Sequence, residues 1–116
     1  LFACGALVDA LQRSGQDAAA QSRLAECFED LEFAQHNGWN SLSLQLGRLR
    51  LLILSGQAAP ASELMATLFD RGMRARGILT EDPVLSRLAD TPAYRELIER
   101  IDTAVATARR TIAAPG

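Results

Sequence analysis

The sequence predicts an all-α fold, and three observations carry that prediction. Ala and Leu are the commonest residues and aromatic residues make up 5% of the chain, a mixture that favours helix over sheet. Apolar residues recur at spacings of three and four, as they do along one face of a helix. Glycines and prolines fall between these segments, at places where they end or begin helices.

The first two predicted helices span residues 1–13 and 17–35 and form an antiparallel hairpin. Gly15 lies between them and suits the left-handed residue that ends a helix. Asp17 follows and is a suitable N-terminal cap for the second helix.

Residues 41–55 form the most apolar stretch, with eight Leu or Ile residues among fifteen. The stretch contains Arg48 and Arg50 and is shorter than the ~20 apolar residues that a membrane span needs. We therefore expect a helix, capped by Asn40 or Ser41, that is apolar on most of its circumference. Such a helix must be buried by neighbours on several sides.

A fourth helix is predicted from Pro60 to about Arg76, with Gly77 closing it. Asp82-Pro83 and Thr91-Pro92 each combine a capping residue with a first-turn proline. They predict a short helix and then a long amphipathic helix.

On the exposed side of the last helix, pairs of opposite charge stand four residues apart. Arg95 can reach Glu99, and Glu96 can reach Arg100, so we expect ion pairs within the helix. Residues 111–116 are expected to be a frayed tail.

Part of the sequence is repeated. Residues 11–20 align with residues 52–61 at an offset of 41, sharing a Leu, a Ser-Gly-Gln sequence and a closing Ala. The match continues into the following apolar positions, where Leu24 corresponds to Met65. Repeated helical hairpins bury their faces against one another and form a solenoid.

The first hairpin resembles a tetratricopeptide repeat. That family places small or apolar residues at fixed positions, here Leu7, Leu11, Gly15, Ala20, Leu24 and Cys27. The second copy keeps Gly56 and Ala61 but is looser, and the 41-residue offset exceeds the 34 residues of the family. Residues 81–97 are similar to the ending of many bacterial proteins that contain such repeats.

The resemblance implies a right-handed superhelix of two hairpins, at residues 1–37 and 39–77. Helices within residues 82–110 would close it, so that one domain spans residues 1–110. We expect the chain to be a piece of a longer bacterial protein that acts in signalling or transcription regulation, with an effector domain upstream.

Cys4 and Cys27 are predicted to lie level with each other across the first hairpin. They could be a redox pair, half of a metal site, or two buried thiols acting as small hydrophobic residues. Two cysteines do not make a disulfide framework, so we expect free thiols and a reducing cytoplasm.

No motif of an enzyme, metal or cofactor site is present in the sequence. The single histidine, His36, lies in a helix-ending sequence and is expected to act in capping. The net charge is −2 and no long basic run occurs, so we expect neither nucleic-acid nor membrane binding.

A partner-binding stripe is predicted on the first helix of each hairpin, because these helices line the groove in the family. Its polar members are Asn40, Ser41, Gln45, Arg48, Gln12 and Arg13, and an ordinary solvated stripe is the alternative. Arg48 and Asn40 are the leading candidates for contacts to a peptide. Trp39 is either an interface anchor or packed between the two hairpins.

The function expected from this reading is protein–protein interaction, with a peptide or helix bound in the groove. The alternative is a sensor domain that encloses a small ligand and controls an upstream effector. The exposed face of the last helix would also suit a homodimer.

Overall fold

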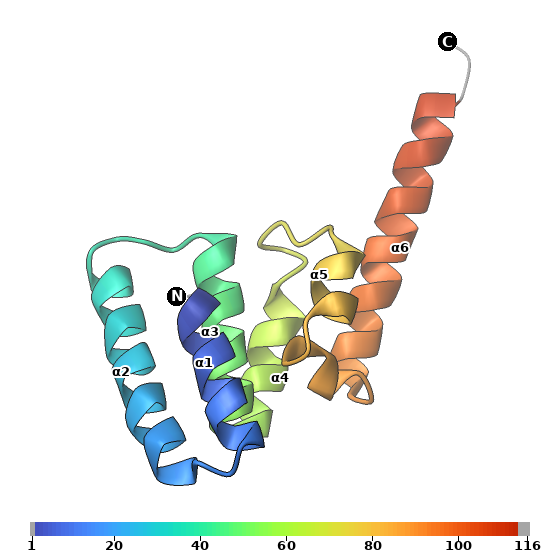
Figure 1. Cartoon of the computed structure of the whole chain (residues 1–116). Coiled ribbons are helices and arrows are strands. Elements are labelled where there is room, and N and C mark those ends of the chain that lie inside the picture. Colours follow the sequence, from blue (N-terminus) through green and yellow to red (C-terminus); the bar gives the residue numbers. More distant parts are fainter. Residues whose placement is uncertain (1, 114–116) are drawn as a thin grey trace. The chain divides into compact units, whose positions relative to one another are not determined.

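The computed structural model describes the backbone of residues 2–113 and the side chains of residues 4–113. Its regular structure is helical throughout these residues, as predicted (Figure 1). The helices are α1 (Phe2–Arg13), α2 (Asp17–His36), α3 (Leu42–Leu54), α4 (Ala58–Thr67), α5 (Arg76–Glu81), the 3₁₀ helix η1 (Leu85–Leu88) and α6 (Pro92–Ala113). The chain folds as two compact units, Leu1–Ala61 and Ser62–Gly116.

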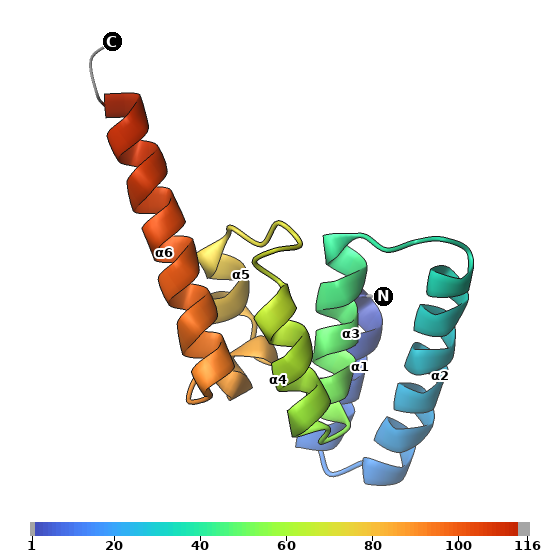
Figure 2. The same ribbon diagram turned by 180° about the vertical axis from the view of Figure 1, so that it is seen from behind.

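The first unit is built around α3. Figures 1 and 2 show α1, α2 and α3 side by side, and α1 and α2 form the predicted antiparallel hairpin. Five leucines of α3 are between 0% and 6% exposed: Leu44, Leu46, Leu49, Leu51 and Leu54. The predicted burial of this helix on several sides is therefore confirmed.

Gly5 lies where α1 packs against α3. A Cβ at this position would lie 3.8 Å from Arg50 and from Leu54, both on α3, which is an ordinary van der Waals contact. Val8, one turn further along α1, is fully buried. Leu7, which the repeat pattern places among the apolar positions, is instead 41% exposed.

The two Ser-Gly-Gln turns have the same structure. Gly15 and Gly56 both have a φ of 76°. In each turn the backbone N–H of the following glutamine donates to a leucine carbonyl five residues earlier, at 2.9 Å. This pattern is the Schellman ending of a helix, in which glycine takes the left-handed conformation.

The side-chain hydrogen bonds of the two turns also correspond to each other. Ser14 and Ser55 each donate a hydroxyl hydrogen bond to the carbonyl three residues earlier, at 3.1 and 3.0 Å. Gln16 and Gln57 each donate to the serine oxygen, at 3.0 and 2.8 Å. The sequence repeat therefore corresponds to a repeated turn geometry.

The two cysteines lie level across the α1–α2 hairpin, as predicted, but they are not free thiols. Their sulfur atoms are joined in a disulfide, with the Cα atoms of Cys4 and Cys27 6.0 Å apart. The spacing argument found the juxtaposition and missed the bond, because covalent pairing depends on the distance between the two helices. Disulfides persist in oxidising environments, so the bond gives no support to the expected cytoplasmic location.

In the second unit, α4 ends at Thr67 rather than near Arg76. Gly72, with a φ of 103°, is the residue that takes the left-handed conformation after the turn. The N–H of Met73 donates to the carbonyl of Leu68 at 3.0 Å, and both side chains are fully buried. The helix therefore ends before this turn, earlier than the periodicity alone predicted.

Gly77 does not close a helix but lies inside α5, a six-residue helix that the sequence did not predict. Its core residue, Leu79, is fully buried. α5 packs against η1 and α6 within the second unit.

The hydrogen bonds expected of the two capping residues form. Asp82 Oδ1 accepts from the N–H groups of Val84 and Leu85, at 2.8 and 3.0 Å, in the turn that leads into η1, whose own N-cap residue is Val84. Thr91 Oγ1 accepts from the N–H of Tyr94 at 3.4 Å and begins α6. For the second helix the predicted cap is wrong, because Asp17 lies inside α2 and Gln16 precedes it.

α6 extends further than expected. Residues 111–113 are helical, so the prediction of a frayed tail is wrong for them, and residues 114–116 lie outside the described residues. Tyr94, Leu97 and Ile101 are buried, whereas residues 106–113 are exposed. The buried face predicted for this helix is therefore confirmed only for its first half.

The expected ion pairs within α6 do not form. Arg95 donates instead to the carbonyl of Asp90 at 2.7 Å, and Arg100 pairs with Asp70 at 3.2 Å. An exposed pair on a helix contributes only about 0.3–0.5 kcal/mol, so acceptors outside the helix compete easily. Glu96 and Glu99 are left without an ion pair among the described residues.

The disulfide should be a major contribution to the stability of the first unit. Closing a loop of this size stabilises a chain by roughly 3 kcal/mol, so a reducing agent should lower the Tm by about 10 °C or more. Thermal unfolding followed by circular dichroism, with and without dithiothreitol, measures this. A Cys4→Ala/Cys27→Ala variant is the control and should not respond to the reductant; two reactive thiols in the denatured, unreduced protein would contradict the bond.

Substitutions at two leucines test the central role of α3. Leu49→Ala removes a fully buried side chain and should lower the free energy of unfolding by about 2–5 kcal/mol. Leu7→Ala removes the same atoms from a side chain that is 41% exposed and should cost less than about 1 kcal/mol. Urea denaturation of both variants measures the difference, and equal costs would show that α3 is not the core.

Candidate protein-binding surface

The polar residues at the start of α3 are engaged within the helix. Ser41 is its N-cap, because Ser41 Oγ accepts a hydrogen bond from the N–H of Leu44 at 3.2 Å. Gln45 is only 3% exposed, and its side-chain amide donates to Asn40 Oδ1. Gln45 is therefore withdrawn from solvent, whereas Asn40 and Ser41 remain exposed.

The other polar residues of the predicted stripe connect elements of the first unit. Arg48 donates to Gln35 Oε1 at 2.7 Å, which links α3 to α2, and its Nε is buried without a partner. Gln12 donates to the carbonyl of Leu54 at 2.9 Å, which links α1 to the end of α3. These contacts give both side chains a structural role, and a contact with a partner stays a prediction for them.

The side chain of Arg13 is 61% exposed and pairs with Asp9 of the same helix at 3.1 Å. The structure therefore does not gather the predicted stripe into one solvated surface. Sequence spacing placed these residues on suitable helices, but neighbouring helices take up several of their polar groups.

Trp39 is 67% exposed, so the expectation that it packs between two hairpins is wrong. The reading of Trp39 as an interface anchor stays open. Phe33 is 72% exposed, and sequence reasoning had not singled it out. The available signal was its place off the apolar stripe of its helix, which leaves this side chain facing solvent.

The end of α2 determines where these two aromatic residues lie. Gly38 has a φ of 84°, and the N–H of Trp39 donates to the carbonyl of Ala34 at 3.1 Å. In this Schellman ending the residue after the glycine lies beside the last turn of the helix, which here begins at Phe33. The backbone therefore places Phe33 and Trp39 on neighbouring parts of one helix end.

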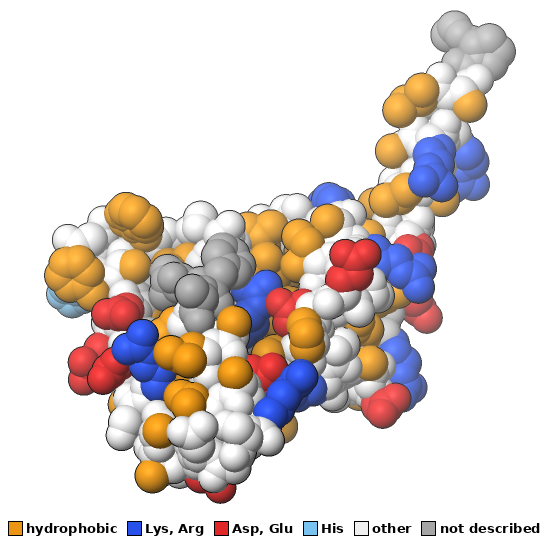
Figure 3. Space-filling view, viewed as in Figure 1, with side chains coloured by type: hydrophobic (Ala, Val, Ile, Leu, Met, Phe, Trp, Pro, Cys, Tyr) orange, Lys and Arg blue, Asp and Glu red, His pale blue; other side chains and the backbone are white. Residues whose placement is uncertain are grey.

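Acidic side chains continue this surface along α2. Glu29 and Asp30 precede Phe33 by four and three residues and share its face of the helix. Both are exposed and have no ion pair among the residues that the structure describes. Figure 3 shows hydrophobic side chains beside the single histidine at this end of α2, with acidic side chains below them.

We call Phe33, Trp39, Glu29 and Asp30 the aromatic–acidic surface. Its two aromatic rings are mostly exposed, and its two carboxylates are free to accept hydrogen bonds. The arrangement suits contact with a group that is both apolar and cationic, because a cation is attracted to carboxylates and to the faces of aromatic rings.

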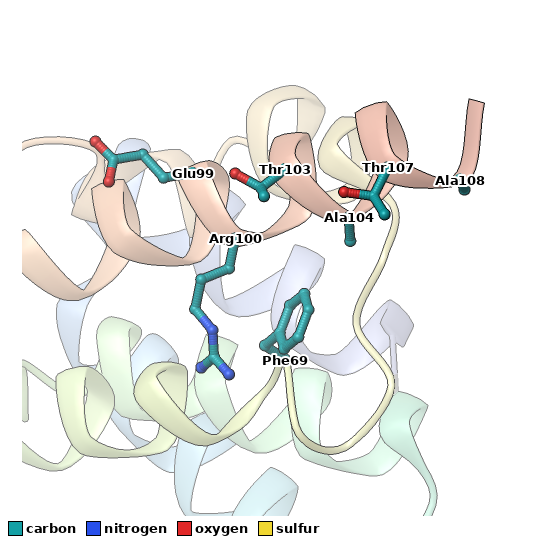
Figure 4. A pocket seen from close by; sticks show the side chains of 7 residues that line it. All are labelled: Phe69, Glu99, Arg100, Thr103, Ala104, Thr107 and Ala108. Carbon is teal, nitrogen blue, oxygen red and sulfur yellow. The ribbon is translucent and has the colours of Figure 1, made fainter. Parts of the chain in front are cut away.

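A hollow of about 650 Å³ lies in the second unit, along α6 (Figure 4). Its lining consists of Phe69, Glu99, Arg100, Thr103, Ala104, Thr107 and Ala108. The guanidinium carbons of Arg74 and Arg100 lie 3.6 and 4.2 Å from the centre of the Phe69 ring. These cation–π contacts hold the ring beside α6.

Among the described residues, no three His, Cys, Asp or Glu side chains come together as metal ligands. None of the described helices has the length and apolar character needed to cross a membrane.

Comparisons of the chain with family models, with curated proteins and with solved structures found no match.

A pair of substitutions measures the structural role of Arg48. Arg48→Ala leaves Gln35 without its donor between α2 and α3 and should lower the free energy of unfolding by about 1–3 kcal/mol. Arg23→Ala removes only an exposed ion pair with Glu26 and should cost less than about 1 kcal/mol. Chemical denaturation compares the two variants. A cost for Arg48→Ala no larger than that for Arg23→Ala would show that Arg48 has no structural role and would again make it a candidate for binding a partner.

Proposed function

We propose that this chain is a protein-interaction module that binds a peptide or helix of another protein. The observation that carries the proposal is the exposure of Phe33 and Trp39, at 72% and 67%, on one helix end. Aromatic residues dominate the binding energy of interfaces when a partner buries them. Two large rings left in solvent are therefore a candidate anchor for a partner.

The charges around the rings indicate the chemistry of the partner. Residues 1–61 carry six acidic and four arginine side chains, and Glu29 and Asp30 border the rings. A segment that combines Lys or Arg with apolar residues would pair with the carboxylates and cover the rings. We therefore propose a basic, amphipathic segment as the ligand.

The finer architectural proposal is a superhelix similar to that of tetratricopeptide repeats. Its support is the matched geometry of the turns at Gly15 and Gly56, together with the buried Ala20 and Ala61 that follow them. The proposal that the parent is a bacterial signalling or regulatory protein rests on the sequence resemblance of residues 81–97.

A small-ligand sensor has less support. A sensor needs a pocket that surrounds its ligand. Four residues of the hollow along α6 are themselves exposed, namely Glu99, Thr103, Thr107 and Ala108. The hollow is thus open along one side, and it suits a surface contact better than an enclosed ligand.

Selection from a random peptide library displayed on phage tests the proposed function. The native chain should retain peptides enriched in Lys or Arg and apolar residues. Trp39→Ser and Phe33→Ser should each weaken binding of a selected peptide at least tenfold, which corresponds to about 1.4 kcal/mol. Glu29→Arg should weaken it by reversing a charge beside the rings.

Ile112→Ser is the matched control, because it removes an apolar side chain that is 85% exposed on another element. It should leave peptide affinity unchanged. The proposal would be overturned if the native chain selected no peptide, or only peptides that Trp39→Ser binds equally well.

A further inference from the structure

The exposed face of α6 carries charges of opposite sign at its two ends. Glu96, Glu99, Thr103, Thr107 and Arg110 follow one another at spacings of three and four. On an ideal helix they lie within about 80° of arc, and all five are exposed. We call these residues the polar stripe of α6.

The stripe is left open by the folding of the second unit. The arginines that could neutralise its glutamates turn elsewhere, since Arg95 donates to the carbonyl of Asp90 and Arg100 pairs with Asp70. At the other end, Arg110 makes only a hydrogen bond of 3.4 Å to Thr107 among the described contacts. Two glutamates and an arginine thus lack charged partners on one continuous face.

We propose that α6 pairs with the α6 of a second copy of this chain, antiparallel and centred on Thr103. In that register Glu96 lies opposite Arg110 of the other copy, and Thr103 lies opposite its own equivalent. The two-fold axis repeats the Glu96–Arg110 contact at both ends, so each copy supplies what the other lacks. A parallel pair would instead place like charges opposite each other.

The residues between the charged ends suit close contact of two helices. Thr103 and Thr107 are small, and Ala104 and Ala108 border them in the hollow beside Phe69. Small side chains let a second helix approach. The hollow of about 650 Å³ leaves room for side chains of the other copy next to the Phe69 ring.

The polar stripe of α6 belongs to the second unit, and the aromatic–acidic surface belongs to the first. The two proposals rest on different residues, so either can fail alone.

Sedimentation equilibrium on the full chain tests the proposal, at concentrations up to about 500 µM because a single helix pair is a small interface. We expect a monomer–dimer equilibrium that weakens when the salt concentration rises from about 50 to about 500 mM. Glu96→Arg/Glu99→Arg and Arg110→Glu should each weaken the dimer at least tenfold, because each places like charges opposite one another.

An equimolar mixture of these two variants decides the register. Antiparallel pairing restores opposite charges at both ends, so the mixture should form a heterodimer at least as tight as the native dimer. Such a rescue also shows that both variants are folded. A parallel pair would not be weakened by the substitutions, since like charges already face each other in it.

Glu29→Arg is the control for charge reversal on another exposed helix face, and it should leave the dimer unchanged. A further check is Thr103→Cys, the position on the two-fold axis, which a short thiol cross-linker should join to its equivalent. Ile112→Cys, on the opposite face of α6, should give no such product. A native chain that stays monomeric, variants that dimerise as the native chain does, or a mixture without a heterodimer would each overturn the proposal.

Discussion

The first unit depends on the burial of α3. A helix with leucines around most of its circumference cannot leave a solvated face, so α1 and α2 must cover it. The polar side chains that enter this contact need partners of their own, because an unpaired buried polar group is costly. Gln45 and Arg48 therefore bind Asn40 and Gln35 and lose much of the freedom that a binding residue needs.

Glycines with positive φ set the ends of the helices and decide the environment of the residue that follows them. Gln16 and Gln57 follow such glycines and bind the serine of their turn. Met73 follows Gly72 and is fully buried, whereas Trp39 follows Gly38 and is 67% exposed. The same backbone conformation is thus followed by a buried side chain at Met73 and by a mostly exposed ring at Trp39. This difference is the basis of the aromatic–acidic surface.

Both proposed surfaces consist of side chains that the fold leaves exposed. On α2, the helix ending places Trp39 beside the last turn while Glu29 and Asp30 stay unpaired. On α6, the arginines that could neutralise the glutamates find better acceptors on neighbouring segments. In each case the charges that remain indicate the sign of the group that would complete them. The aromatic–acidic surface is complementary to a basic segment. The polar stripe of α6 carries both signs of charge and is complementary to the same stripe on a second copy.

The sequence by itself determined the all-α class, most helix positions, the Asp82 and Thr91 caps and the repeated Ser-Gly-Gln turns, because these depend on contacts within a few residues. It also placed Cys4 level with Cys27 and identified Trp39. Only the tertiary structure decided that the cysteines are bonded, that α4 ends at Thr67, and that Arg95 and Arg100 leave their helical neighbours. These outcomes depend on distances between elements. Small differences in free energy between competing partners then determine which contact forms. For the same reason, most side chains of the predicted partner-binding stripe form internal contacts. The exposed Phe33 was found only in the folded chain.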